Sequence, residues 1–200
     1  MKKILFATGN PTKAKRFSAG LAKYDIEVLS LKDMNLTLEA EENGKTAIEN
    51  ALIKAHECFK KANMPSMGMD DSLYLEGVPE SEQPGLFVRR VNGKSLEDAE
   101  LLEHYINLVK KYGVDGKLPC KWVYGLAVIN ENGEENTYTW EKGNFYMVDT
   151  PSSIVNPGYP LNSISKYNDL DKYFTEVTAA DLEVIKVNED DVVEFIKNNI

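Results

Sequence analysis

Residues 3–17 read KILFATGNPTKAKRF, and this stretch decides how the chain begins to fold. The short apolar run at residues 3–8 predicts a buried strand. Asn10 is a favourable N-cap and Pro11 suits the first helical position, so we expect a helix from there to about Tyr24. The strand therefore passes through a tight turn directly into a helix.

A second apolar run, at residues 26–31, predicts another strand and completes a β-α-β unit, which indicates an α/β fold. Thr46 and Glu49 have the spacing of a capping box before a helix. A short strand is expected to end at Asp70-Asp71. The other expected elements are a helix that a cap at Ser95 and Asp98 begins, a closing helix at 189–200, and strands at 120–130 and 136–148 around an Asn-Gly hairpin turn.

The composition excludes several classes of protein. The chain has 32 acidic and 23 basic residues and a net charge of -9, which argues against binding to a nucleic acid polymer or to an anionic membrane surface. No apolar run approaches the roughly 18 residues of a membrane-spanning helix. The apolar start is too short for a signal peptide, and Cys58 and Cys120 form no metal or disulfide motif, so we expect a cytoplasmic protein.

The turn between the first strand and the first helix is a candidate phosphate site. Free backbone N–H groups and the positive end of the helix dipole converge there, and Lys13 adds a full charge. The spacing differs from that of a P-loop. The alternative is an ordinary β-α junction with a surface lysine.

Two acidic pairs and one basic pair are further candidates. Glu41-Glu42 precede a helix and Asp70-Asp71 follow a strand, and a few carboxylates with bound water suit Mg²⁺. The alternative is that they are solvated surface pairs. Arg89-Arg90, after a Pro-Gly turn, could clamp phosphate oxygens or could equally be a solvated pair.

These pieces together resemble the inosine-triphosphate pyrophosphatase family of nucleotide hydrolases. The most specific match is EENGKTAIENALIKA at residues 41–55. TGNPTK at 8–13 matches the first motif of the family, although Arg16 stands where the family has a glutamate. DDSL at 70–73 matches a third motif without its glycine, and Pro84, Gly85 and Arg90 retain part of a fourth.

The resemblance implies an α/β fold with a long twisted mixed sheet flanked by helices, in a single domain over residues 1–200, with two lobes around a central cleft. It implies a homodimer with Mg²⁺ as its cofactor. The implied reaction is the hydrolysis of deaminated or nonstandard purine nucleoside triphosphates to a nucleoside monophosphate and pyrophosphate.

The resemblance also assigns roles to residues. Asp71, Lys13 and Lys54 are the expected catalytic residues, with Asp71 activating the attacking water. The expected substrate-binding residues are Thr8, Gly9, Asn10, Lys13, Ser72, Arg90 and Tyr159. The expected metal ligands are Glu42, Asp71 and Asp70.

The C-terminal half departs from the family. PGYPL at residues 157–161 stands where the family has an aromatic FGYDP segment, and Lys186-Val187-Asn188 replace a Ser-His-Arg triplet that grips the purine base. A hydrolase of another nucleotide, or a nucleotide-binding relative without catalysis, therefore stays open as an alternative. The positive charge of Arg16 is expected to replace or disturb part of the metal and phosphate network.

Overall fold

The structure, a computed structural model, describes residues 1–9, 13, 15–39, 41–185 and 189–200. The chain divides into two compact units. The first unit comprises Met1–Asp71, Val123–Trp140 and Glu189–Ile200, and the second comprises Ser72–Trp122 and Glu141–Asn188. The single domain and the cleft between lobes stay predictions.

A six-stranded sheet has the order β2-β1-β3-β6-β7-β8. The strands are β1 (Lys2–Phe6), β2 (Ile26–Ser30), β3 (Ser66–Leu75), β6 (Lys117–Ile129), β7 (Glu135–Val148) and β8 (Ser165–Tyr167). Strand β1 runs parallel to β2 and β3, whereas β7 and β8 are antiparallel, so the sheet is mixed. A separate two-stranded sheet pairs β4 (Arg90–Val91) with β5 (Lys94–Ser95).

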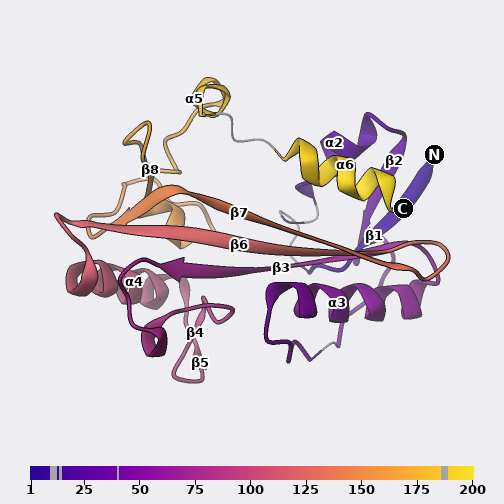
Figure 1. Cartoon of the computed structure of the whole chain (residues 1–200), viewed down its shortest axis with the longest axis horizontal. Coiled ribbons are helices and arrows are strands. Elements are labelled where there is room, and N and C mark those ends of the chain that lie inside the picture. Colours follow the sequence, from indigo (N-terminus) through magenta and orange to yellow (C-terminus); the bar gives the residue numbers. More distant parts are fainter. Residues whose placement is uncertain (10–12, 14, 40, 186–188) are drawn as a thin grey trace. The chain divides into compact units, whose positions relative to one another are not determined.

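Helices flank the sheet. They are α2 (Ser18–Ala22), α3 (Ala47–Ala62), α4 (Asp98–Tyr112), α5 (Ala179–Val184) and α6 (Asp190–Asn198), with 3-10 turns η1 (Glu80–Glu82) and η2 (Pro160–Ser163). In the first unit, α3 lies along one face of the sheet and α2 and α6 lie along the other (Figure 1). The expected α/β fold with a mixed sheet flanked by helices is confirmed.

Helix α3 packs unusually close to the sheet because two strand residues facing it are glycines. A Cβ atom on Gly125 would lie 2.5 Å from the backbone of Ala47 and Ile48, and one on Gly68 would run into the carbonyl oxygen of Ala51. Ala51 and the buried Ala127 of β6 belong to the core at this interface. Small residues on both sides therefore bring the backbone of α3 close to β3 and β6.

The second unit has its own core. Helix α4 contributes Leu101, Tyr105, Leu108 and Val109, which pack with side chains from the second-unit parts of β3, β6 and β7. The Tyr105 hydroxyl donates a 3.1 Å hydrogen bond to the carbonyl of Val88, so the one polar atom of this buried ring is satisfied.

Three local predictions are wrong. A turn at Arg16 and Phe17 interrupts the expected first helix, and the buried Phe17 packs against Phe6 with ring centroids 6.1 Å apart. The N-cap of α4 is Glu97, because its side chain and that of Glu100 form the capping box. Thr46 does cap α3, but the Glu49 carboxylate accepts from the N–H of Lys45, not from that of Thr46.

Both cysteines are expected to resist alkylation in the folded protein. Burial raises the pKa of the Cys58 and Cys120 thiols to about 12, so little thiolate forms at pH 8. Mass spectrometry after iodoacetamide treatment at pH 8 should find both thiols unmodified in the native protein and both modified in guanidinium. Rapid modification of either thiol without denaturant would contradict this packing.

Candidate active site

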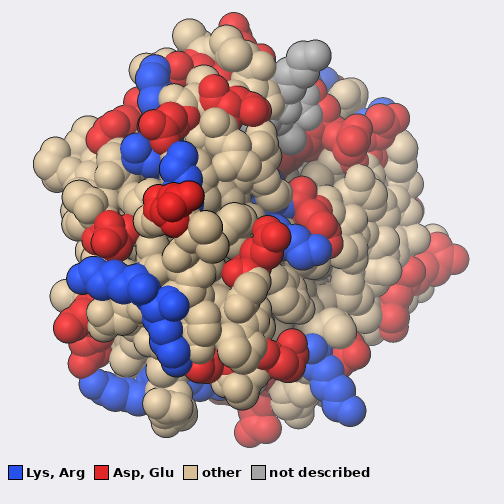
Figure 2. Space-filling model, turned by 60° about the vertical axis from the view of Figure 1, so that its left-hand side comes forward, with Lys and Arg blue, Asp and Glu red and all other residues tan. Residues whose placement is uncertain are grey.

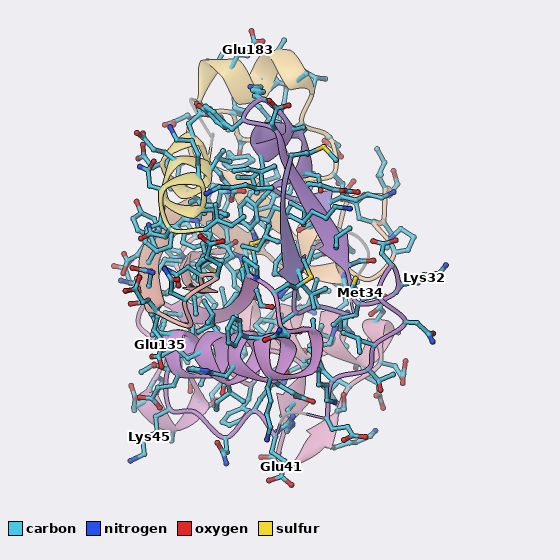
Figure 3. All side chains as sticks on the ribbon, turned by 90° about the vertical axis from the view of Figure 1, so that its right-hand side faces the viewer. Lys32, Met34, Glu41, Lys45, Glu135 and Glu183 are labelled. Atoms are coloured by element: carbon cyan, nitrogen blue, oxygen red, sulfur yellow. The ribbon has the colours of Figure 1, made fainter. Side chains whose placement is uncertain are left out.

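A pocket of about 940 Å³ opens in the first unit, where β1 and β2 end. Its lining includes Thr8 and Gly9 after β1, Lys13 and Lys15 from the following turn, and Glu42 and Lys54. The opposite wall comes from residues 28–38, from which Lys32 projects outward (Figure 3). The carboxyl ends of parallel strands are where ligands bind in α/β sheets, so this pocket is the candidate site.

Lys54 is the centre of one charge cluster in this pocket. Its Nζ lies 2.9 Å from Glu42 Oε2 and 3.1 Å from Asp70 Oδ1, and only 11% of its side chain is exposed. Helix α3 carries Lys54, the preceding loop carries Glu42 and β3 carries Asp70. Two carboxylates therefore fix the ammonium group with little freedom to move.

Asn50 also belongs to this cluster, and the sequence motifs did not single it out as a site residue. Its side-chain amide donates a 2.8 Å hydrogen bond to Asp70 Oδ2, and its oxygen accepts from the N–H of Gly44 at 2.9 Å. Asn50 lies one helical turn before Lys54 on α3, which is the spacing of residues that share a helix face. The four-residue spacing from Lys54 is the sequence signal that could have identified Asn50 as a site residue.

Lys13 and Asp71 form a second charge pair, on the other face of β3. The Lys13 ammonium contacts Asp71 Oδ1, and each side chain is about three-quarters buried, with 26% and 22% exposed. Successive side chains of a strand point to opposite faces, so Asp70 meets α3 while Asp71 meets the turn after β1. The two adjacent aspartates thus have different partners.

The position of the aspartates corrects the sequence prediction. Asp70 and Asp71 lie in the middle of β3, which continues to Leu75, and not at the end of a strand. Both are somewhat more exposed than their buried neighbours Met69 and Ser72, and lysines and an asparagine meet their carboxylates. Because the two aspartates interrupt the apolar pattern of β3, the sequence indicates a short strand where the structure has a long one.

Arg16 is turned into the interior and bonded to a carboxylate. Its guanidinium contacts the Glu189 carboxylate through two nitrogens and lies 4.6 Å from the ring centroid of Tyr124. Burial alone would lower the pKa of Arg16, but the hydrogen bonds and the negative charge of Glu189 outweigh burial and raise it. Burial raises the pKa of the Tyr124 hydroxyl, and the nearby positive charge of Arg16 offsets only part of that increase. Arg16 therefore stays charged, and its positive charge is balanced by the Glu189 carboxylate.

The carboxylates of the first unit are the candidate metal ligands. Among residues 1–9, 13, 15–39, 41–185 and 189–200, no group of three or more His, Cys, Asp or Glu side chains forms a ready metal cage. Glu42 and Asp71 nevertheless supply oxygen donors in the first unit. Mg²⁺ commonly uses one or two carboxylates with water and substrate phosphates, so a magnesium site at Glu42, Asp71 and Asp70 stays a prediction.

Three predicted substrate-binding residues belong to the second unit. Ser72 is buried in β3, Tyr159 precedes η2, and both belong to the second unit. Arg90 lies 5.4 Å from the ring centroid of Phe87 and lines a separate pocket of about 280 Å³ in that unit. Asn10 lies outside the described residues. Their roles in binding substrate stay predictions.

On the face shown in Figure 2, acidic and basic side chains are interspersed and form no broad basic surface. Within the described part of the chain, no helix has both the length and the apolar character needed to cross a membrane.

Comparison with known proteins decides the family. The model of the Ham1 family matches residues 4–146, which is well over half of the chain. The chain belongs to the Ham1 family. This Ham1 match covers the first unit's site residues up to Asp71, and it confirms the family that residues 41–55 indicated.

Relatives of this Ham1-family chain include two curated bacterial proteins. A dITP/XTP pyrophosphatase from Oceanobacillus iheyensis is 31% identical over 140 residues, which are 70% of each chain. A dITP/XTP pyrophosphatase from Bacillus subtilis is 28% identical over 179 residues, covering 90% of this chain and 87% of the relative.

Solved Ham1 structures share the fold. The Ham1 protein of Staphylococcus aureus aligns over 100% of both chains with a TM-score of 0.76 and 18% identity. A Ham1 protein from Coxiella burnetii aligns over 99% of this chain and 98% of its own, with a TM-score of 0.74 and 21% identity. The likeness extends through the C-terminal half, where the sequence motifs depart.

Proposed function

We propose that this chain is a nucleoside-triphosphate pyrophosphatase that requires Mg²⁺ and acts on deaminated purine nucleotides such as dITP and XTP. One observation carries the proposal: Lys13, Lys54 and Glu42 line one pocket beside the ends of β1 and β2, where Asp71 pairs with Lys13 and Asp70 with Lys54. Cationic groups for phosphates and carboxylates for a metal are the components of phosphoanhydride hydrolysis. The names of the curated relatives support the same reaction.

In the proposed reaction, water adds across the anhydride bond between the α and β phosphates and releases pyrophosphate. Asp71 accepts the proton of the attacking water. Lys13 leaves Asp71 to bind a phosphate oxygen, and Lys54 neutralises charge that develops on the leaving pyrophosphate. Asp70, both of whose oxygens accept hydrogen bonds, orients Lys54.

Mg²⁺ would be held by Glu42 and Asp71 together with the phosphates of the substrate. When bound, it would supply positive charge that polarises the phosphate oxygens. Thr8, Gly9 and Asn10 would bind phosphate through the turn after β1, with Ser72, Arg90 and Tyr159 as further substrate contacts. A homodimer and a cytoplasmic location complete the proposal.

A hydrolase with another nucleotide as substrate is the second candidate. The observation that favours it is the departure at residues 157–161, where the family has an aromatic segment that contacts the base. The other departure, at residues 186–188, lies outside the described residues. A site that loses hydrogen-bond donors to a base edge loses much of its selectivity for that base.

A panel of nucleoside triphosphates tests the proposal. Purified protein with Mg²⁺ should release pyrophosphate from ITP, dITP and XTP faster than from the common nucleotides. Release from pyrimidine nucleotides but not from ITP would favour the second candidate. No release from any nucleotide, combined with nucleotide binding in a calorimetric titration, would indicate a relative without catalysis.

A further inference from the structure

Arg16 occupies a box made of one carboxylate and three aromatic rings. Its Nε lies 2.8 Å from Glu189 Oε2, and its second terminal nitrogen contacts Glu189 Oε1. Its guanidinium carbon lies 4.6, 5.6 and 5.7 Å from the ring centroids of Tyr124, Phe17 and Trp140. The two charged side chains are only 20% and 18% exposed, so the ion pair is largely removed from water.

The pair joins elements that are far apart in the sequence. Glu189 is the N-cap residue of α6 and lies 173 positions after Arg16. The remaining terminal nitrogen of Arg16 lies 3.8 Å from the sulfur of Met69. Met69 directly precedes Asp70-Asp71 on β3, so the guanidinium bridges the C-terminal helix to the strand that carries the aspartates.

The same residue closes the turn that carries Lys13. The N–H of Arg16 donates a 3.0 Å hydrogen bond to the carbonyl of Lys13. The Arg16 backbone therefore fixes the Lys13 turn, while its side chain binds Glu189 and contacts β3. Arg16 thus bonds to the backbone of Lys13 and contacts Met69, which lies two positions before Asp71 on β3.

Helix α6 makes a further contact in its second half. Phe195 stacks on Tyr138 with centroids 5.1 Å apart, and the rings continue through Trp140 to Tyr124, which contacts Arg16. Phe195 therefore holds α6 to β7 through a contact in which Arg16 takes no part, so Glu189 lies on a helix with its own anchor.

We propose that Arg16 and Glu189 are positioning residues, which hold the Lys13 turn in register with Asp71 through the C-terminal helix. The pair does not touch the substrate. This inference rests on the proposed function for its kinetic consequence. Its structural part, the fixing of the Lys13 turn by α6, can be measured without any substrate.

The test compares Glu189→Gln, Arg16→Met and the double variant with a control, Glu57→Gln. Glu57 pairs with Lys61 at 2.6 Å on α3 in the same unit. Glu189→Gln is expected to lower kcat for dITP about tenfold with little change in KM, because misplaced reacting groups slow the chemical step. The double variant should be no slower than the slower single variant, because the two residues act as one unit. The control should leave kcat unchanged.

Hydrogen exchange separates this inference from the proposed function. In Glu189→Gln, the backbone amides of residues 15–22 should exchange faster than in the control, at a temperature where circular dichroism shows both proteins folded. If these amides exchange at the same rate in Glu189→Gln and in the control, the positioning role of Arg16 and Glu189 is refuted, even where the enzyme is active. If the unaltered protein releases no pyrophosphate, the proposed function fails. Faster exchange in Glu189→Gln would then still support the positioning role. Additive losses of kcat in the double variant would also refute it.

Discussion

Replacing Asp71 by asparagine is expected to slow Mg²⁺-dependent pyrophosphate release on the order of 10³-fold. The amide keeps the shape of the side chain but cannot take a proton from water, and it carries no charge for a metal or for Lys13. Lys13 would then lose the carboxylate with which it is paired. Steady-state kinetics with dITP over a range of Mg²⁺ concentrations measures the loss, and excess Mg²⁺ should not restore the rate.

The matched control is Glu27→Gln. Glu27 pairs with Lys3 at 2.9 Å on neighbouring strands of the same unit, so this change also removes a carboxylate from a lysine. It should leave kcat unchanged, because a partly exposed surface pair contributes little and lies outside the pocket. Near-native turnover in Asp71→Asn would show that Asp71 has been given the wrong role.

Replacing Gly125 by alanine is expected to reduce the free energy of unfolding by about 3 kcal/mol. The added Cβ would lie 2.5 Å from backbone atoms of Ala47 and Ile48, and backbone cannot rotate away as a side chain can. Helix α3 would have to move off the sheet, and Lys54 and Asn50 would move with it. Urea unfolding followed by circular dichroism measures the stability, and activity should fall as well.

Gly143→Ala is the control for this change. Gly143 also lies in a long strand, β7, but a Cβ there would lie 4.0 Å from its nearest neighbour, Lys121. This substitution should be neutral or stabilise the protein by about 0.5 kcal/mol, since alanine restricts the unfolded chain. Equal losses in the two variants would mean that the close approach of α3 is not what Gly125 permits.

Much of the first unit could be predicted from the sequence because its signals are local. The apolar runs before and after the first turn predicted β1 and β2, and Thr46 marked the start of α3. The Asn-Gly pair predicted the turn before β7, and the structure agrees, because Gly133 there has a positive φ. The chain after Asp71 was expected to be extended but not to continue the same strand, because the two acids interrupt the apolar pattern that indicates a strand.

The candidate site was predicted in part. Lys13, Lys54, Glu42 and the two aspartates came from motifs, and the structure pairs them in one unit. The partner of Arg16 could not be found, because Glu189 lies at the far end of the chain and no local pattern links the two. Arg16 was expected to replace or disturb part of the metal and phosphate network. The structure shows its guanidinium bonded to Glu189 and in contact with aromatic rings, and its effect on that network stays a prediction.

Gly68 has a consequence for the chemistry two and three positions after it. Only a glycine fits where β3 passes the carbonyl of Ala51, so this position must face α3. Successive side chains of a strand point to opposite faces, so the position of Gly68 determines that Asp70 meets Lys54 and Asp71 meets Lys13. A slip of one residue would press a methionine against α3 and exchange the two aspartates. Gly68 therefore fixes the register of β3. A shifted register would be unfavourable because of the packing against α3, whatever its effect on the reaction.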